Sequence, residues 1–294
     1  MSMAEPDFNE LLHKNISIKD CLAFLTYCFN ENNIDNPRLE AEIIVSHIKG
    51  FSREKLFLND ALILDKKDKI NIVSSAMKKI EGMPTAYITG KKEFYSLPFI
   101  VTPDVLIPRP ETEELVQYAL SIKKLPDNAN VLDFGTGSGV IAIILAIKKS
   151  GWNITASDKS AKAIEVAKIN QTHLCPDSKI VWAVRDGLDI WNPEHKFDMI
   201  ISNPPYISKK EYESLPLSIK RYEPKYALTD DIDGLTYYRH IHASLRDILK
   251  PDGLLICEIG EKQVEPLLYI FGNDAEFIND ISGKPRIMVY SHKP

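Results

Sequence analysis

The spacing of apolar residues divides the chain into a helical part and a part in which strands alternate with helices. Between residues 17 and 82, apolar side chains recur every three or four positions, and this period is typical of amphipathic helices. Ser17, with Asp20 three positions later, has the spacing of a helix start, and Gly50 has the position of a helix end. Residues 1–84 are therefore expected to form a small helical bundle.

Residues 85–102 show neither the helical spacing of the first part nor the alternation of strands and helices of the second. β-branched and aromatic residues lie on both sides of a polar stretch there, which predicts a β-hairpin or an extended linker. The three prolines from Pro103 to Pro110 then predict a rigid surface loop that leads into a helix starting at Glu111. We expect the second domain to begin with this loop and to cover residues 103–294.

Short apolar runs alternate with helical segments from residue 130 onward. Strands are expected at 130–134, 154–158, 179–184, 197–202 and 253–259, with one or two more in the tail, and helices at 140–149, 161–170 and 235–249. This alternation predicts an α/β fold with a doubly wound parallel sheet. Ligands of such sheets bind outside the carboxyl ends of the strands.

Polar residues stand at four of these predicted strand ends. They are Asp133, Asp158, Asp186 and Asn203. The first is followed by a glycine-rich turn made of Gly135, Thr136, Gly137, Ser138 and Gly139. The last glycine comes one residue too early for the dinucleotide-binding fingerprint, and the Gly-Lys-Ser/Thr of a P-loop does not follow. The turn is therefore expected to bind a ligand of another class.

The acidic residues indicate which class of ligand this is. Asp133 stands just before the glycines, where its charge would repel a phosphate and would suit a cation such as the ammonium group of a methionine moiety. Asp158 follows Gly135 by 23 positions, which matches the ribose-binding acid of nucleotide sites. Asp186 and Gly187 are expected to line an adenine pocket. Together these residues fit S-adenosylmethionine, with S-adenosylhomocysteine as the product.

The strand predicted at 197–202 ends in the sequence Asn203-Pro204-Pro205-Tyr206. Neither proline can donate to a sheet ladder, so the chain is expected to form a stiff corner there. The carbonyls of Asn203 and Pro204 would face outward beside the ring of Tyr206. Two acceptors and a flat aromatic ring suit a planar group that carries an NH2. An ordinary proline-rich turn explains the tetrapeptide equally well by itself, and the neighbouring strand ends favour a catalytic and substrate-binding site.

Composition and charge limit the possible classes of protein. The chain has 294 residues, of which 44% are hydrophobic and 26% charged, as is usual for globular proteins. Its net charge of −5 is unlike that of proteins that grip duplex nucleic acid. Its four cysteines are scattered without zinc-site spacing, so neither disulfides nor a metal is expected. The first ten residues lack the apolar segment of a signal peptide and no run is long enough to span a membrane, so a cytoplasmic protein is expected.

Several longer segments resemble one family, the HemK/PrmC protein-(glutamine-N5) methyltransferases. The matching segments are 84–90 with Glu93 and Phe94, 103–113, 133–139, 203–207, Glu223-Pro224 with Ala227-Leu228, 233–235 with Tyr238-Arg239, and 258–260 with Gln263. The segment Ile107-Pro108-Arg109-Pro110-Glu111-Thr112-Glu113 is the most discriminating one, because adenine and cytosine amino-methyltransferases share the Asn-Pro-Pro-Tyr motif. The chain departs from the family pattern at Phe134, Ser138 and Gly187, and the last departure leaves the adenine-packing residue unassigned.

The resemblance implies a function and a site. It implies a seven-stranded, mostly parallel class I methyltransferase sheet with a small helical N-terminal domain that recognises the substrate. The implied reaction transfers a methyl group from S-adenosylmethionine to the side-chain nitrogen of the glutamine in the GGQ motif of class I peptide chain release factors. Asn203, Pro204, Pro205 and Tyr206 would bind and orient that glutamine, with Phe94 and Arg109 at the substrate entrance. A monomer without nucleic-acid partners is expected.

Three other functions remain open at the level of sequence. The first is an N6-adenine nucleic-acid methyltransferase, which the acidic balance and the compact helical N-terminus disfavour. The second is a methyltransferase that acts on a ribosomal-protein glutamine, since that sister family shares the motif. The third is an interaction module that has lost catalysis, which the intact Asn203 and Tyr206 disfavour.

Overall fold

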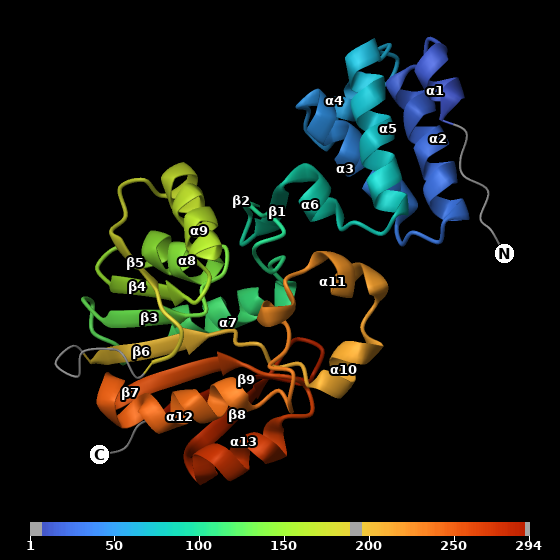
Figure 1. Ribbon diagram of the computed structural model, residues 1–294. Coiled ribbons are helices and arrows are strands. Elements are labelled where there is room, and N and C mark those ends of the chain that lie inside the picture. The colour runs from blue at the N-terminus through green and yellow to red at the C-terminus, as the bar shows by residue number, and fades with distance from the viewer. Residues whose placement is uncertain (1–7, 189–195, 292–294) are drawn as a thin grey trace. The chain divides into compact units, whose positions relative to one another are not determined.

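The computed structural model describes residues 8–188 and 196–291 and divides the chain into two compact units, Met1–Gly90 and Lys91–Pro294. The first unit is helical and the second contains the sheet (Figure 1). Each unit has its own hydrophobic core, so each is described separately below.

The helical unit contains six helices within residues 8–90. They are α1 (Asn9–His13), α2 (Ile18–Glu31), α3 (Pro37–Lys49), α4 (Arg53–Leu58), α5 (Lys66–Ile80) and α6 (Thr85–Thr89). The predicted signals act as expected at two ends: the Ser17 hydroxyl accepts a hydrogen bond from the Asp20 N–H, and Gly50 ends α3 in the left-handed conformation. Leu25, Phe29 and Ile44 are buried in the centre of this bundle.

The stretch expected to be a hairpin or linker is divided between the two units. Residues 85–89 form helix α6, which Gly90 ends in a left-handed conformation. The hairpin itself is shorter than expected and consists of β1 (Lys91–Phe94) and β2 (Leu97–Ile100). Its turn residues Tyr95 and Ser96 both have positive φ angles, 52° and 61°. The positive φ angles were not predictable from these residue types, since glycine or asparagine usually occupies such positions.

The second unit is built on a seven-stranded sheet in the order β5-β4-β3-β6-β7-β9-β8. The strands are β3 (Asn130–Phe134), β4 (Asn153–Asp158), β5 (Ile180–Val184), β6 (Phe197–Ser202), β7 (Leu249–Glu258), β8 (Ala275–Asn279) and β9 (Pro285–Ser291). The first five in the spatial order run parallel, and β9 is antiparallel to both β7 and β8. The seven-stranded, mostly parallel sheet expected from the resemblance is therefore confirmed.

Helices cover both faces of this sheet (Figure 1). One face is covered by α7 (Pro110–Ser121), α8 (Val140–Lys148) and α9 (Ala161–Leu174), and the other by α12 (Thr236–Ile248) and α13 (Val264–Phe271). Successive residues of a strand enter opposite cores: Val131 packs on the side of α8, and Leu132 packs on the side of α12. Burial on both faces explains why the strands appear in the sequence as continuous apolar runs.

The chain reverses its direction of travel across the sheet between β3 and β6. From β3 it proceeds through β4 to β5, and it then returns to place β6 on the other side of β3. Such a switch point leaves a crevice outside the carboxyl ends of the two central strands. Asp133 lies near the end of β3 and Asn203 directly after β6, so the fold places both at this crevice.

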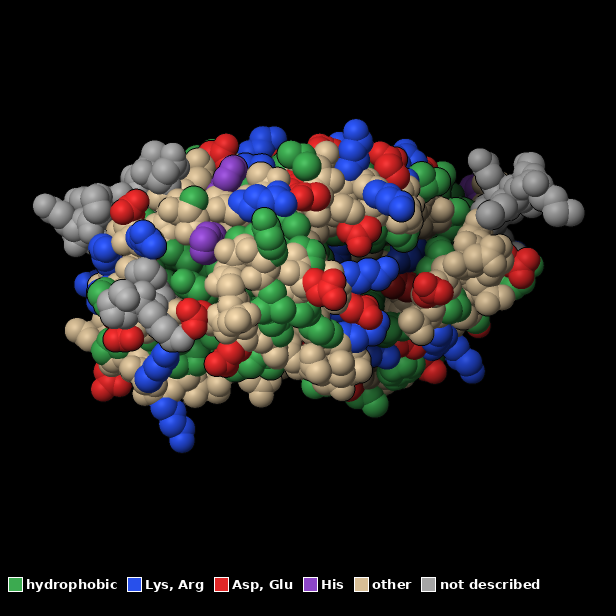
Figure 2. Space-filling view, turned by 90° about the horizontal axis from the view of Figure 1, so that it is seen from below, with side chains coloured by type: hydrophobic (Ala, Val, Ile, Leu, Met, Phe, Trp, Pro, Cys, Tyr) green, Lys and Arg blue, Asp and Glu red, His purple; other side chains and the backbone are tan. Residues whose placement is uncertain are grey.

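Several short elements between β6 and β7 and after β7 were not predicted from the sequence. They are α10 (Lys209–Ser214), α11 (Leu217–Tyr222), η1 (Lys225–Ala227), α13 and η2 (Gly272–Asp274). None of the helices in the described ranges is long and apolar enough to cross a membrane. On the face seen in Figure 2, basic side chains are interspersed with acidic and apolar ones.

Candidate active site

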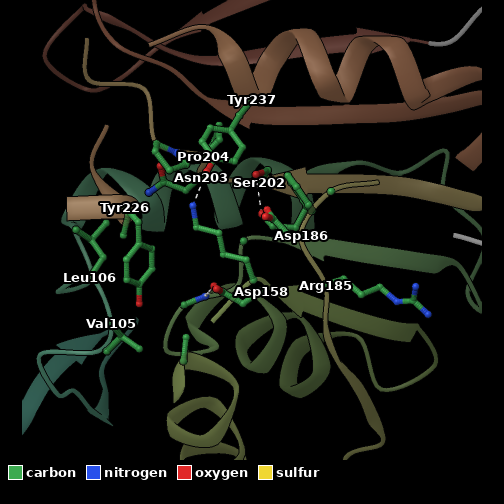
Figure 3. Close-up of a pocket in the computed structure, with 18 of the residues that line it drawn as sticks. Val105, Leu106, Asp158, Arg185, Asp186, Ser202, Asn203, Pro204, Tyr226 and Tyr237 are labelled. Carbon is green, nitrogen blue, oxygen red and sulfur yellow. Dashed lines mark hydrogen bonds between the residues drawn. The ribbon is translucent and has the colours of Figure 1, made fainter. Parts of the chain in front are cut away.

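A pocket lies at the switch point of the sheet. Its walls come from three regions: the loop before α7, the carboxyl ends of the central strands, and the segment before β7 (Figure 3). The lining residues are Asp104, Val105, Leu106, Phe134, Gly135, Gly137, Asp158, Lys159, Ala163, Arg185, Asp186, Gly187, Ser202, Asn203, Pro204, Pro205, Tyr226, Ala227 and Tyr237. Three of the four predicted strand-end residues, Asp158, Asp186 and Asn203, therefore meet at one cavity.

The glycine-rich turn presents its backbone to this pocket. Gly135 and Gly137 line the cavity, and both have positive φ angles. The Asp158 carboxylate accepts hydrogen bonds from the N–H groups of Gly137 (2.9 Å) and Ser160 (2.8 Å). Burial raises the pKa of Asp158, and these two hydrogen bonds oppose the shift. Asp158 thus holds the turn in place from the end of β4 while it faces the pocket.

Asp133 has a different position from the one that the sequence suggested. Its side chain is fully buried and does not line the pocket. One carboxylate oxygen accepts from the Thr136 hydroxyl (2.6 Å) and from the Ala142 N–H (3.1 Å), and the other has no hydrogen-bond partner. Burial raises the pKa of Asp133 to about 7. In this structure Asp133 ties the turn to helix α8 and lies behind the wall of the pocket.

The remaining residues of the turn lie behind the pocket wall. Thr136 and Ser138 are buried, and Gly139 begins α8 at a φ of 83°. A Cβ on Gly139 would lie 3.0 Å from Ala167 Cβ and 3.1 Å from Trp182. The first two glycines therefore face the ligand space, and the third allows α8 to pack closely against α9 and β5.

The end of the third strand contributes Asp186 and Gly187 to the lining, as expected for an adenine pocket. The next residue, Leu188, is buried in the core on the side of α12 and does not line the cavity. Arg185 also belongs to the lining, and its side chain extends away from the centre of the site in Figure 3.

The Asn-Pro-Pro-Tyr corner separates the first pocket from a second one. Asn203 and Pro204 line both cavities, Pro205 lines only the first, and Tyr206 lines only the second. The second cavity is mainly apolar, with Leu106, Ile207, Leu215, Ile219, Ala227 and Leu228 in its wall together with Arg109. Leu106 and Ala227 also line both cavities, so the two pockets meet beside these two residues and the polar corner of Asn203 and Pro204.

Buried polar contacts hold the corner from below. The Asn203 side-chain NH2 donates to the Thr112 hydroxyl (3.0 Å), and this hydroxyl donates to Glu258 (2.7 Å). The Tyr206 hydroxyl donates to the other oxygen of Glu258 (3.3 Å). Burial raises the pKa of Glu258 to about 7 and also raises that of Tyr206. The two ends of the corner thus share one buried carboxyl group at the end of β7.

The backbone of the corner is fixed as well. The Gln263 side chain donates to the carbonyls of Tyr206 and Gly234, both at 3.0 Å. A Cβ on Gly234 would lie 2.2 Å from the Tyr206 carbonyl oxygen, so only glycine fits at this position. The Asp230 carboxylate accepts from the N–H groups of Gly234 (2.9 Å) and Thr236 (3.0 Å), which orders the loop that makes this contact.

The two residues expected at the substrate entrance have different environments. Arg109 lines the second pocket and donates to the buried carboxylate of Glu223 (2.7 Å), which also accepts from the Ile107 N–H. Phe94 does not reach the entrance. Its side chain points from β1 into the core and packs edge-on against Phe99, because the pleat of this short strand turns that position inward.

Several lining residues were not identified from the sequence. The Lys159 ammonium group donates to the Tyr237 hydroxyl (2.7 Å) and lies 5.3 Å from the centre of the Tyr226 ring. Leu215 and Ile219 belong to short helices that were not predicted. Only the sequence position of Lys159, directly after Asp158, was a usable signal. The others are brought to the site by long-range folding.

The geometry supports group transfer between two bound molecules. The first pocket combines backbone donors, an acidic residue at the ribose-binding position and apolar walls, which suits a nucleoside. The second is lined mainly by apolar residues, which suits the aliphatic part of a side chain. The corner between them supplies fixed acceptors. Among the described residues, no cluster of His, Cys, Asp and Glu has the arrangement of a metal site.

Comparisons with known proteins identify the family. Two family models match: the methyltransferase small domain over residues 117–216 and the PrmC N-terminal domain over residues 20–90. A release factor glutamine methyltransferase from Chlorobaculum tepidum is 35% identical, over 90% of this chain and 92% of that protein. One from Salmonella typhimurium is also 35% identical, over 86% and 91% respectively. A bifunctional methyltransferase from Rickettsia conorii is 34% identical over 94% of this chain and 58% of that protein.

A solved structure supports the assignment of the fold. The catalytic domain of hMettl16, solved in complex with a MAT2A 3'UTR hairpin, has a TM-score of 0.50 at 16% identity and covers 80% of this chain and 86% of that one. The fold and the site thus define an enzyme of the class I methyltransferases. The relatives specify it further: the chain belongs to the release factor glutamine methyltransferase family.

Proposed function

We propose that this enzyme transfers a methyl group from S-adenosylmethionine to the side-chain nitrogen of the glutamine in the GGQ motif of class I peptide chain release factors. The observation that carries the proposal is the position of Asn203 and Pro204, which line both the nucleoside-shaped pocket and the apolar pocket. Two relatives, of which this chain covers about nine tenths, are named release factor glutamine methyltransferases.

In the proposal the first pocket holds S-adenosylmethionine. Gly135 and Gly137 allow the cofactor to approach the backbone, Asp158 accepts from the ribose hydroxyls, and Asp186 and Gly187 lie at the adenine. S-adenosylhomocysteine is the product that leaves this pocket. The cofactor supplies an electrophilic methyl group at its sulfonium, and the chain supplies the orientation of the group that attacks it.

The second pocket takes the glutamine side chain. An amide nitrogen is a poor nucleophile because its lone pair is delocalised into the carbonyl. Acceptance of its two N–H groups by the Asn203 Oδ1 and the Pro204 carbonyl fixes the nitrogen in position and stabilises the positive charge that develops there. The Tyr206 ring packs against the amide plane and sets its tilt. Positioning of this kind supplies a large part of the rate enhancement in bimolecular reactions.

The proton leaves after methyl transfer in this scheme. The amide nitrogen becomes strongly acidic once it has formed the new bond, so the site does not need a strong base in contact with it. The proton passes to solvent or to the acceptors at the corner. This order agrees with the lining of the second pocket, whose described residues include Arg109, Asn203 and Tyr206 but no Asp, Glu or His.

The helical unit is proposed to recognise the release factor, since the PrmC N-terminal domain model matches it over residues 20–90. The enzyme would then meet its partner in the cytoplasm, where translation takes place, and would act as a monomer. An N6-adenine methyltransferase needs a surface for many phosphates, whereas this chain has a net charge of −5 and a mixed-charge face in Figure 2. The alternative substrate is a ribosomal-protein glutamine, which carries the same side-chain amide.

The test is methyl transfer measured by mass spectrometry on three purified substrates: a release factor, a ribosomal protein and DNA. Methylation of the glutamine in the release factor alone is the expected result. Methylation of DNA without the release factor would overturn the proposal.

The Asn203→Ala variant tests the role of the corner. Its turnover is expected to fall by about 100-fold or more, because one of two fixed acceptors is lost, while the affinity for S-adenosylmethionine changes little. Single-turnover kinetics and calorimetric titration separate the two effects. Asn273→Ala is the matched control, since Asn273 is exposed in η2 away from both pockets. Retained turnover in Asn203→Ala would remove this residue from the mechanism.

A further inference from the structure

The oxygen and the NH2 group of the Asn203 carboxamide have almost the same shape, so packing alone does not decide which of them faces the glutamine. The proposed reaction needs the oxygen at that place, because the incoming group is an NH2. In the structure the Asn203 NH2 is turned away and donates to Thr112. The Asn203 oxygen has no hydrogen bond to the described residues, and Asn203 lines both pockets.

The direction of this amide follows from the hydrogen-bond donors and acceptors of Thr112, Tyr206 and Glu258. An ionised carboxylate has only lone pairs, so the hydroxyls of Thr112 and Tyr206 must both donate to Glu258. A threonine hydroxyl has one hydrogen, and Thr112 gives it to Glu258. Its oxygen can then only accept from Asn203. The carboxylate at the end of β7 thus dictates, through one hydroxyl, that Asn203 presents its NH2 downward and its oxygen to the substrate.

The fold places these groups together with little freedom. Ser202 of β6 pairs with Cys257 of β7, so the next residues along the two strands, Asn203 and Glu258, lie side by side. Thr112 stands in the first turn of α7, where the partial positive charge of the helix end favours an ionised partner. Thr112 and Glu258 are 3% and 1% exposed, so water does not compete for their hydrogen bonds.

We propose that Thr112 and Glu258 are positioning residues that set the direction of the Asn203 carboxamide and thereby make it an acceptor for the substrate NH2. The inference rests on the proposed function, since it assigns a role within that site. Neither residue touches the pockets, and both act through Asn203.

Three variants test this role. Thr112→Val keeps the shape and removes the hydroxyl, Thr112→Ser keeps the hydroxyl, and Glu258→Gln replaces one acceptor oxygen with a donor. Turnover at saturating substrates is expected to fall by about 10–100-fold in Thr112→Val and Glu258→Gln, as for misplaced catalytic groups. Thr112→Ser should retain most of the wild-type turnover. The KM for release factor and the affinity for S-adenosylmethionine should stay within about twofold, because one hydrogen bond to the glutamine changes while the other contacts of both substrates remain.

A purely structural role would give another result. Thr112→Ser would then be as damaged as Thr112→Val, or losses of turnover would follow losses of thermal stability. Thr26→Val is the matched control for a threonine-to-valine exchange, because the Thr26 hydroxyl bonds only to the Leu22 carbonyl within α2. Unchanged turnover in both Thr112→Val and Glu258→Gln would overturn the inference.

A second measurement does not depend on the substrate. The side-chain NH2 signals of Asn203 can be observed by nitrogen-15 NMR and assigned by their absence in Asn203→Asp. Slow exchange with water is expected in the wild type, and faster exchange in Thr112→Val and Glu258→Gln. Identical signals in all three proteins would overturn the inference even if the release factor were not the substrate. Inactivity of the wild type on release factor would instead contradict the proposed function alone.

Discussion

At the scale of single residues, the direction of the Asn203 carboxamide is set by hydrogen bonding and charge, because packing does not distinguish its two orientations. Asn203 and its neighbours would pack equally well with the carboxamide turned over, but the hydrogens of Thr112 and the charge of Glu258 permit one direction. A carboxyl group this deeply buried is costly to ionise. Burial raises the pKa of Glu258 to about 7, and nearby Glu111 adds to the shift, whereas Thr112, Arg286 and the Tyr206 hydroxyl oppose it.

This pKa gives the reaction an expected dependence on pH. As pH falls through about 7, Glu258 gains a proton that it can donate to Thr112, and the constraint on Asn203 is lifted. Turnover of the wild type should therefore decrease on the acidic side of about pH 7. The pH profile of kcat at saturating substrates measures this, with Glu258→Gln as comparison.

The acidic decrease should be absent from the profile of Glu258→Gln. Its persistence would assign it to another group, and Asp133, whose pKa burial also raises to about 7, is the first to examine through Asp133→Asn. The same shift affects stability. The folded chain binds the Glu258 proton more tightly than the unfolded chain, so this group's contribution to folding stability declines as pH rises from 4.5 to about 7.

At the scale of elements, the glycines of the glycine-rich turn differ in what requires them: backbone conformation at Gly135, and both conformation and close packing at Gly139. Gly135 and Gly139 both have positive φ angles, which an L-amino acid adopts at a cost of roughly 1–2 kcal/mol. A Cβ on Gly135 meets no atom within 4 Å, whereas one on Gly139 meets Ala167, Trp182 and Ile143 at 3.0–3.2 Å. The two glycines therefore differ in packing although their backbones are alike.

Alanine substitutions separate these two costs. Gly139→Ala should lose about 1–3 kcal/mol more unfolding free energy than Gly135→Ala, because it adds crowding between α8, α9 and β5 to the same backbone strain. Denaturant unfolding of the two variants provides the comparison. Equal losses would mean that α8 moves away from α9 without cost.

The elements also explain how far the sequence could be interpreted. β3 and β6 have the predicted bounds because both are apolar runs buried on two faces and ended by polar or proline residues. The strand ends therefore indicated the place of the site, and the short α10 and α11, which lack a strong period, were missed. Asp133 carried the expected charge at the expected strand end, but no local pattern shows whether a side chain faces a cavity or the core.

Residues that act through others were the least predictable. Thr112 and Glu258 lie within segments of the family resemblance, yet the sequence gives no reason to connect them. Their contact joins positions 146 residues apart and depends on the order of strands in the sheet. Phe94 was misplaced for the same reason, since the face to which a four-residue strand turns its last side chain is set by the register of the hairpin.

At the scale of the whole molecule, the helical unit offers apolar surface that its own core does not use. In α4, Phe57 and Leu58 are 49% and 85% exposed, whereas the preceding residue, Leu56, is buried. A single exposed apolar side chain is common on a protein surface. Two adjacent ones, in a unit that is proposed to recognise a protein, indicate a contact that can be tested.

Leu58→Ala tests this contact in the full-length enzyme. We expect the KM for intact release factor to rise by roughly fivefold, or about 1 kcal/mol, because an apolar contact is lost. The kcat should not change, and neither should the KM for a short peptide that contains only the glutamine loop. Ile281→Ala is the control, since Ile281 is 97% exposed in the catalytic unit. Equal KM values for the intact factor in both variants would exclude α4 from recognition.

The carboxylate beneath Asn203 also bears on when the enzyme becomes active during its synthesis. A nascent chain that has emerged through Tyr206 contains the glycine-rich turn, α7 and the whole corner, but Glu258 has not yet been made. Domains generally fold as the chain leaves the ribosome, and parallel strands with distant partners pair late. Asn203 gains its direction only when β7 joins β6. An enzyme that modifies the translation machinery thus completes its own active site only after Glu258 has been made, more than 50 residues after the corner itself.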